Sequence, residues 1–171
     1  GLSPFGKDVI RKMNELGILV DISHAAESTF YDALETSAYP IIASHSSARA
    51  LCNHPRNLTD EQLKALAAQG GVVQVCLYKG FINEDAEKAS LSDAIRHITH
   101  IVDLIGIHHV GIGSDFDGDG ELIGCRASNE LINITVRLIK EGYTENDIAK
   151  IWGGNLLRVM NKAQSASNNK I

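Results

Sequence analysis

The segment Val110-Gly111-Ile112-Gly113-Ser114-Asp115 is a short β-branched run that ends in a carboxylate. A run of this length is too short for a helix and is typical of a buried strand. Strand residues alternate between two faces, so Gly111 and Gly113 share a face with Asp115. We therefore expect these glycines to leave open space below the carboxylate. Three other runs have the same form and are predicted as strands: residues 18–24, 41–44 and 72–77.

Helical signals separate these four strands. Pro4 starts one helix, Thr59 and Gln62 form a capping box before another, and Gly106 stops a third. Alternating strands and helices indicate βαβ units with a parallel sheet, and hence an α/β protein. A polar loop is expected at residues 79–90. The predicted helices cover residues 4–16, 26–38, 59–69, 91–105, about 127–141 and about 145–161.

The chain has 171 residues, of which 44% are hydrophobic and 22% are charged, values typical of one soluble globular domain. We expect the domain to cover residues 1–161 and a polar C-terminal tail to cover residues 162–171. The net charge of −5 argues against a nucleic-acid partner and against an anionic membrane surface. The first residue is Gly1 rather than Met, so we expect that other sequence precedes it.

The same composition favours a cytoplasmic protein. No uncharged apolar run reaches the roughly 18 residues of a membrane-spanning helix, and residues 1–20 lack the order of a signal peptide. Cys52, Cys76 and Cys125 are an odd number without C-x-x-C spacing, so we expect buried free thiols in a reducing compartment. Neither a G-x-G-x-x-G motif nor a P-loop is present, which leaves no motif for a nucleotide.

Polar residues follow three of the predicted strands, namely His24, His45 and Asp115. The carboxyl ends of parallel strands meet at one edge, where a (β/α)8 barrel holds its catalytic residues. Neutral imidazoles with a carboxylate are the usual ligands of a catalytic zinc, so a metal site is the favoured interpretation. An acid–base site with a serine nucleophile from residues 44–47 stays open, but no G-x-S-x-G motif supports it.

Asp115 also starts the segment Asp115-Phe116-Asp117-Gly118-Asp119-Gly120, which places oxygen donors where a calcium loop has them. The last ligand position of such a loop falls on Arg126, a cation where a bidentate Glu is required. We therefore reject a calcium site. Asp115 is expected to be functional, whereas Asp117 and Asp119 are expected to hydrogen-bond the turn.

The first predicted strand, residues 18–24, does not fit the regular alternation of side chains between the two faces of a sheet. If His24 faces the barrel interior with Val20 and Ile22, Asp21 faces the helix layer, where a lone carboxylate is costly. A strand irregularity or a basic partner is therefore needed. Arg56 lies in a Pro-containing loop and could clamp a substrate carboxylate, although spacing alone favours a solvated surface position. The remaining histidines are expected to be structural: His54, His97, His100, His108 and His109.

Five blocks follow one another along the chain: residues 20–24 (VDISH), 42–50 (IASHSSARA), 54–60 (HPRNLTD), 70–74 (GGVVQ) and 109–118 (HVGIGSDFDG). Together they resemble the membrane (renal) dipeptidase family, and residues 153–159 (GGNLLRV) resemble its last helix. The likeness extends from Gly1 to about Met160. It implies a zinc metallopeptidase of the amidohydrolase type, with two zinc ions on a (β/α)8 TIM barrel, that hydrolyses dipeptides.

The resemblance implies a role for four residues. His24 and His45 would bind the second zinc, Arg56 would bind the free carboxylate of the dipeptide, and Asp115 would bind substrate and handle the proton during attack. The H-x-D motif of the first zinc and the bridging Glu of the family have no counterpart in this chain. Four strands are also too few for a barrel of about 250 residues. The chain therefore resembles the C-terminal half of a barrel, with about four βα units.

Two further interpretations stay open. Another amidohydrolase-type metal hydrolase, such as a deaminase or a cyclic-amide hydrolase, would use the same strand ends. A non-catalytic half barrel that assembles with a second chain, or with a copy of itself, is favoured by the missing motifs. The expected partners are thus a dipeptide substrate and the N-terminal half of the barrel or another chain. By itself the chain is expected to be a poor catalyst.

Overall fold

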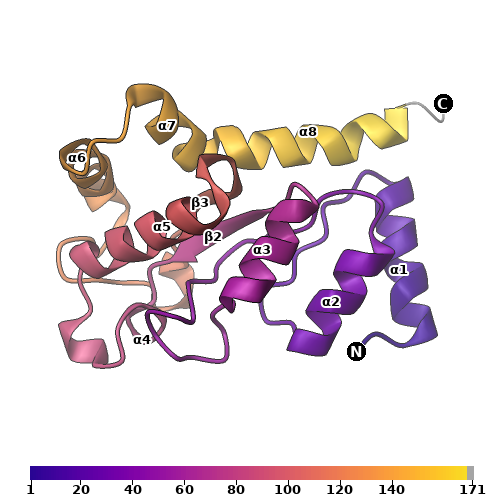
Figure 1. Cartoon of the computed structure of the whole chain (residues 1–171), viewed down its shortest axis with the longest axis horizontal. Helices are drawn as coiled ribbons and strands as arrows, with labels where there is room; N and C mark the ends of the chain where they lie inside the picture. Colours follow the sequence, from indigo (N-terminus) through magenta and orange to yellow (C-terminus); the bar gives the residue numbers. More distant parts are fainter. Residues whose placement is uncertain (169–171) are drawn as a thin grey trace.

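The computed structural model describes residues 1–168 of the chain. It confirms an α/β protein in which helices pack around a small parallel sheet (Figure 1). Cys76 in the second strand pairs with Gly113 in the third, so these two strands end at the same level, and Asp115 leaves the sheet at that edge. The sheet contains three strands that are neighbours in chain order: β1 (Ile42–Ala43), β2 (Val72–Cys76) and β3 (Val110–Gly113).

Residues 18–24 do not form the full strand that the sequence predicts. A single parallel bridge joins Asp21 to Ile42, whose backbone N–H and C=O form hydrogen bonds of 2.9 Å on either side of Asp21. The segment then turns at His24, whose backbone has a left-handed φ of 69°. Since this turn follows the bridge within a few residues, the first predicted strand is reduced to a short extension of the sheet beyond β1.

Several helices begin where the sequence predicts. The Ser3 hydroxyl accepts a hydrogen bond from Gly6 N–H at 3.1 Å, and Thr59 and Gln62 form the expected capping box. No helix within residues 1–168 has both the length and the apolar composition that crossing a bilayer requires. The helices are α1 (Pro4–Glu15), α2 (Glu27–Thr36), α3 (Asp60–Ala68), α4 (Lys79–Ile82), α5 (Leu91–Ile105), α6 (Ile132–Lys140), α7 (Glu145–Ala149) and α8 (Asn155–Asn168).

Some boundaries differ from the prediction. The short helix α4 lies in the expected polar loop, where Phe81 and Ile82 are buried. Helix α6 begins at Ile132 instead of about residue 127, because a 3₁₀ turn precedes it. The helix expected to end near residue 161 continues to Asn168 in α8, and its Ala163 is buried. The end of the expected tail, residues 169–171, lies outside the described residues.

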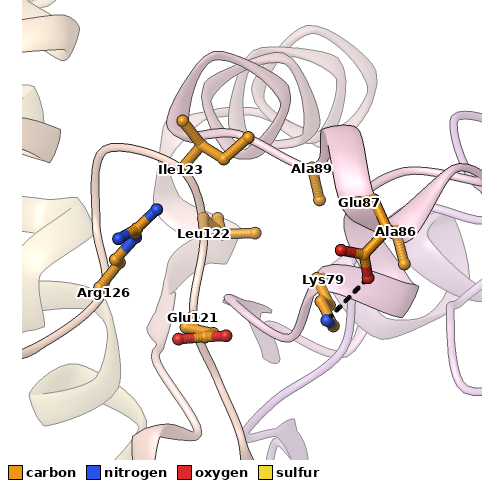
Figure 2. Close-up of a pocket in the computed structure, with 8 residues that line it drawn as sticks. All are labelled: Lys79, Ala86, Glu87, Ala89, Glu121, Leu122, Ile123 and Arg126. Atoms are coloured by element: carbon orange, nitrogen blue, oxygen red, sulfur yellow. Dashed lines mark hydrogen bonds and ion pairs between the residues drawn. The ribbon is translucent and has the colours of Figure 1, made fainter.

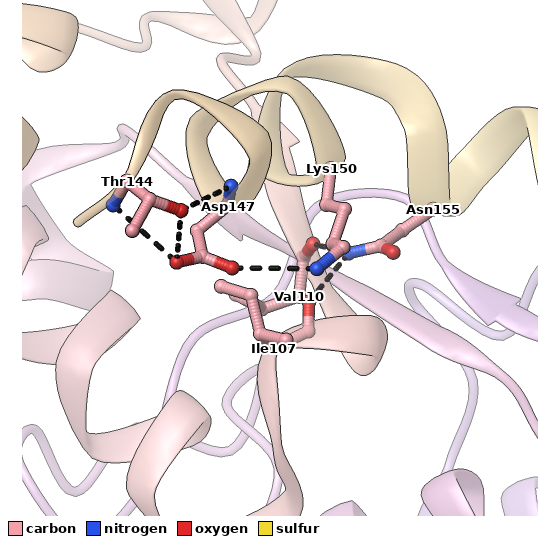
Figure 3. Close-up of polar contacts among 6 residues, drawn as sticks. All are labelled: Ile107, Val110, Thr144, Asp147, Lys150 and Asn155. Atoms are coloured by element: carbon pink, nitrogen blue, oxygen red, sulfur yellow. Dashed lines mark hydrogen bonds and ion pairs between the residues drawn. The ribbon is translucent and has the colours of Figure 1, made fainter.

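The predicted helix at 145–161 is broken into α7 and α8 by a π-helical turn, and α8 is tied to the start of β3 (Figure 3). A capping box of Thr144 and Asp147 begins α7. Asn155 begins α8 and is buried, and its Nδ2 donates to Ile107 O at 2.7 Å and to Val110 O at 2.8 Å. One side-chain amide therefore satisfies two backbone acceptors where the chain enters β3.

His97 on α5 is a structural residue, as expected from the sequence. Its side chain is 1% exposed, its Nδ1 accepts from Ala48 N–H, and its Nε2 faces Ile82 O, both at 3.0 Å. Because a carbonyl oxygen accepts only, Nε2 carries the proton and the ring is neutral. Burial lowers the pKa of His97 to about 4.

We predict that Asn155→Ala lowers the free energy of unfolding by about 1–3 kcal/mol, since it removes the side-chain donor from one buried and one part-buried backbone carbonyl oxygen. Urea unfolding followed by circular dichroism measures this change. Asn161→Ala, at an exposed position of the same helix, is the control and should have little effect. Equal stability of the two variants would contradict the proposed anchoring of α8.

His97 also predicts a loss of stability in acid. Its folded-state pKa of about 4 lies below the ordinary value of 6.5, so the unfolded chain binds more protons between these values. The contribution is complete above pH 6.5 and falls by about 3 kcal/mol as the pH decreases toward 4.

The stability of His97→Gln should therefore approach that of the unsubstituted protein as the pH decreases from 7 to 4. Unfolding curves at several pH values test this, with the exposed His108→Gln as the matched control. A constant difference in stability between His97→Gln and the unsubstituted protein over this range would disprove the assignment.

Candidate functional site

Two imidazole rings meet at the carboxyl edge of the sheet. His24 follows the bridged segment beside β1, and His45 follows β1 itself. Their ring centroids are 4.9 Å apart and the ring planes are inclined by 58°. His24 is exposed, whereas His45 is half-buried. The two histidines predicted from successive strand ends are therefore brought together.

The left-handed turn at His24 is the strand irregularity that the alternation pattern required. The Asp21 carboxylate, for which the sequence required a strand irregularity or a basic partner, accepts hydrogen bonds from serine residues and has no basic partner among these contacts. Its Oδ1 accepts from Ser23 N–H and from Ser44 N–H, each at 3.0 Å, and its Oδ2 accepts from Ser44 Oγ at 2.5 Å. Asp21 thus joins the ends of two neighbouring strands directly behind the histidines.

His45 is held by the same serines. Its backbone N–H donates to Ser23 Oγ at 3.0 Å, and its Nδ1 lies 2.8 Å from Ser44 Oγ. The sequence offers Ser44 only as a possible nucleophile, and it does not single out Asp21 as a site residue. The sequence does contain an indication of their role. Regular alternation would turn Asp21 toward the helix layer, and a carboxylate there needs hydrogen-bond donors.

Arg56 lies beside the histidines and is half-buried, so its side chain is partly withdrawn from the solvated surface position that spacing alone favours. Its Nη2 donates to His45 O at 3.4 Å, and its guanidinium carbon lies 5.4 Å from the Phe81 ring centroid. Burial lowers the pKa of Arg56, and the charges of Asp115 and Asp21 act in the opposite direction. An arginine side chain nevertheless remains charged in a protein.

The loop that carries Arg56 is fixed by Asn57, which is fully buried. Asn57 Oδ1 accepts from Ser47 N–H at 3.1 Å, and its Nδ2 donates to Cys52 O at 2.9 Å and to Phe81 O at 2.8 Å. Every polar atom of this amide has a partner, so the loop is held rigidly where Arg56 leaves it.

Asp115 leaves the end of β3 with a left-handed φ of 57°. The loop after it folds back, since Gly118 N–H and Gly120 N–H donate to Asp115 O at 2.9 and 2.8 Å. A Cβ atom on Gly120 would lie 2.2 Å from Ser114 O, so only glycine fits there. The Cys76 thiol lies 3.7 Å from Asp115 Oδ2, and burial raises the Cys76 pKa to about 12, which keeps the thiol protonated as a donor.

The open space expected below Asp115 is absent. A Cβ atom on Gly113 would lie 1.9 Å from Ser44 O, and one on Gly111 would lie 3.1 Å from Gln74 Cγ. Gln74 Nε2 also donates to Ile112 O at 3.0 Å across the sheet. The glycines therefore admit neighbouring backbone and side chain and do not leave a cavity.

The charges around His24 favour its neutral form. The positive charge of Arg56 lowers the pKa of His24 most, burial and His45 lower it further, and Asp115 and Asp21 oppose them. A neutral imidazole is the form that binds a metal. The His24 ring therefore favours the form that a metal needs, although the described residues hold no cluster of three or more His, Cys, Asp or Glu arranged for a metal.

A separate cavity of about 380 Å³ lies beside α4 and includes none of the four predicted site residues (Figure 2). Within it Lys79 Nζ and Glu87 Oε1 are 3.0 Å apart. Three of its residues also line an adjoining cavity of about 430 Å³ that reaches Phe116 and Asp119 in the Asp115 loop. No sequence pattern predicts that the three shared residues lie together: Lys79, Glu121 and Arg126.

Comparison with known proteins places this geometry in context. Dipeptidase tcpJ of Claviceps purpurea is 36% identical over 168 residues, which make up 98% of this chain and 40% of tcpJ. The crystal structure of the probable dipeptidase PvdM from Pseudomonas aeruginosa has a TM-score of 0.94 at 29% identity, covering 97% of this chain and 55% of that chain.

A metallopeptidase from Rhodobacter sphaeroides, solved with a phosphinate mimic of the dipeptide L-Ala-D-Ala, has a TM-score of 0.91 at 31% identity. That match covers 95% of this chain and 47% of the metallopeptidase chain. The chain thus spans about 40% of the length of the curated relative and about half of each solved structure. Because the model of the membrane dipeptidase family matches residues 1–170, the chain belongs to that family, peptidase family M19.

Proposed function

We propose that the protein containing this chain is a zinc-dependent dipeptidase and that the chain supplies half of its active site. The observation that carries the proposal is the convergence of His24, His45 and Arg56 on one edge of the sheet, with Asp115 at the end of β3, in a member of this family. The charges of Arg56 and Asp115 both act on His24, which supports a shared site for the four side chains.

In this proposal His24 and His45 hold one zinc ion. Zinc, when bound, acts as a Lewis acid that polarises a carbonyl oxygen and activates a water molecule. The exposed ring of His24 and the half-buried ring of His45 leave one side of the pair open for substrate. The remaining ligands, which include those of the first zinc, come from outside this chain.

Arg56 binds the free carboxylate of the dipeptide. A guanidinium group offers two parallel N–H donors to a carboxylate, and this geometry selects a substrate that ends at its second residue. The face of Phe81 and the buried amide of Asn57 hold Arg56 in place before substrate arrives. Less of the binding free energy is then lost in ordering the side chain.

Asp115 binds the substrate amine side and moves a proton to the leaving amine. The Cys76 thiol donates to its carboxylate, and the folded loop after Asp115 fixes its backbone. A carboxylate positioned by fixed donors is suited to general acid–base catalysis.

We further propose that this chain is one half of a (β/α)8 barrel. Within the described residues, β3 forms one edge of the sheet and the bridged residues 20–22 form the other. Exposed apolar side chains on and beside α1, at Phe5, Val9 and Ile18, support a surface that another part of the protein covers. The buried free cysteines support a reducing, cytoplasmic location: Cys52, Cys76 and Cys125.

The metal assignment predicts that His24→Ala and His45→Ala each reduce the zinc content of the full-length protein by about one ion per chain. Elemental analysis after exhaustive dialysis measures the content, and His108→Ala is the control. Unchanged zinc in both variants would remove the two histidines as ligands.

The substrate assignment predicts that Arg56→Met lowers kcat/KM of the full-length enzyme for a dipeptide by about 10- to 100-fold, the value of one charged hydrogen-bond pair. The same dipeptide with an amidated C-terminus should lose much less, because it offers no carboxylate. The control Arg126→Met replaces an exposed cation and should leave kcat/KM unchanged for both substrates.

If Arg56→Met lowered kcat/KM equally for the dipeptide with a free carboxylate and for the amidated dipeptide, the proposed role of Arg56 would be contradicted. Turnover of cyclic amides in preference to dipeptides would contradict the dipeptidase assignment and favour another amidohydrolase-type enzyme.

The isolated chain should hydrolyse dipeptides far more slowly than the full-length enzyme, and comparable rates would contradict the half-site proposal.

A further inference from the structure

We propose that Asp21 and Ser44 form a hydrogen-bond relay that sets the tautomer of His45 and directs its Nε2 lone pair to the site. The proposal deepens the proposed function, because it rests on His45 as a metal ligand. Asp21 and Ser44 act through His45 and are positioning residues.

The direction of the relay follows from an account of its protons. Asp21 Oδ2 and Ser44 Oγ are 2.5 Å apart, and an ionised carboxylate only accepts hydrogen bonds. The single hydroxyl proton of Ser44 therefore lies between them. The second contact of Ser44 Oγ, at 2.8 Å from His45 Nδ1, then needs a proton from the ring. His45 consequently carries its proton on Nδ1, and Nε2 keeps a free lone pair.

The backbone holds the relay in place. The bridge between Asp21 and Ile42 brings the carboxylate next to Ser44, and Asp21 Oδ1 is fixed by two backbone N–H donors at 3.0 Å. Ser23 Oγ accepts from His45 N–H, which fixes the residue on its other side. Both oxygens of Asp21 are thus committed, and the carboxylate cannot turn away from Ser44 without losing other bonds.

A relay of this kind matters because a neutral imidazole can carry its proton on either nitrogen. Histidines that bind metals almost always donate the other ring N–H to an acceptor, and loss of that acceptor typically lowers metal affinity by about 10- to 100-fold. In this chain a serine stands between the carboxylate and the ring. His24 has no such acceptor among the described residues, so the relay acts on His45 alone.

Asp21→Asn is the sharpest test, because it keeps the shape of the side chain and reverses the polarity of one end. The Asn Oδ1 accepts the two backbone N–H groups, so its Nδ2 faces Ser44 Oγ as a donor. The Ser44 proton is then released toward His45 Nδ1, and the ring proton moves to Nε2. Ser44→Ala also removes the acceptor for His45 Nδ1–H, whereas Ser44→Thr retains a hydroxyl and should keep the proton of His45 on Nδ1.

Long-range ¹H–¹⁵N spectra of the metal-free protein with labelled histidine, at a pH where the rings are neutral, identify the protonated nitrogen. We expect Nδ1–H for His45 in the unsubstituted protein and in Ser44→Thr, and Nε2–H in Asp21→Asn. Ser47→Ala, which removes a buried hydroxyl nearby without touching the relay, should leave His45 unchanged. The signals of His97, whose buried ring is held by Ala48 and Ile82 and has no contact with the relay, should be the same in all variants and thereby report an intact fold.

Zinc titration of the same proteins provides the second readout. Asp21→Asn should weaken the zinc affinity by about 10- to 100-fold, and Ser44→Thr should stay close to the unsubstituted protein. An Nε2–H ring in the unsubstituted protein, or an Nδ1–H ring in Asp21→Asn, would overturn the relay. If the tautomers respond as expected but no variant binds zinc, the relay stands and the proposed metal site fails.

Discussion

The parallel alignment of three neighbouring segments is the constraint on which the site depends. Residues 20–22, β1 and β2 run in the same direction, so the residues that follow them emerge at one edge of the sheet. The backbone of Ile42 forms hydrogen bonds on both sides of Asp21, and this pairing brings the turns at His24 and His45 together. A shift of one residue in this register would turn either histidine away from the other.

Buried polar side chains transmit this alignment to the loops. Asn57 fixes the loop that carries Arg56, Asn155 fixes the entry into β3, and His97 joins Ala48 to Ile82 across the core. Asn57 and His97 use all their side-chain donors and acceptors, and Asn155 uses both N–H groups of its amide, so each specifies a single loop position. The same principle applies in the relay, where Asp21 receives three donors.

The sequence predicts much of this arrangement, because local signals decide it. The strand at Val110–Gly113, the capping box at Thr59 and the strand-end histidines follow from patterns within a few residues. The remainder depends on contacts distant in sequence. The turn that shortens residues 18–24, the half-buried position of Arg56 over Phe81, and the filling of the space at Gly113 by Ser44 O each involve partners at least 20 residues away, which a single sequence cannot pair. The proposed roles of these residues come from the resemblance to the dipeptidases, and the structure shows the contacts that hold the residues in place.

The central claim is that His24 and His45 bind one metal ion at this edge of the sheet. Anomalous diffraction at the zinc absorption edge, from crystals of the full-length protein, tests it most directly. The account predicts an anomalous peak about 2.0–2.1 Å from one ring nitrogen of each histidine, with Nε2 as the nitrogen in His45. Zinc bound elsewhere, or no peak within bonding distance of the two rings, would contradict it.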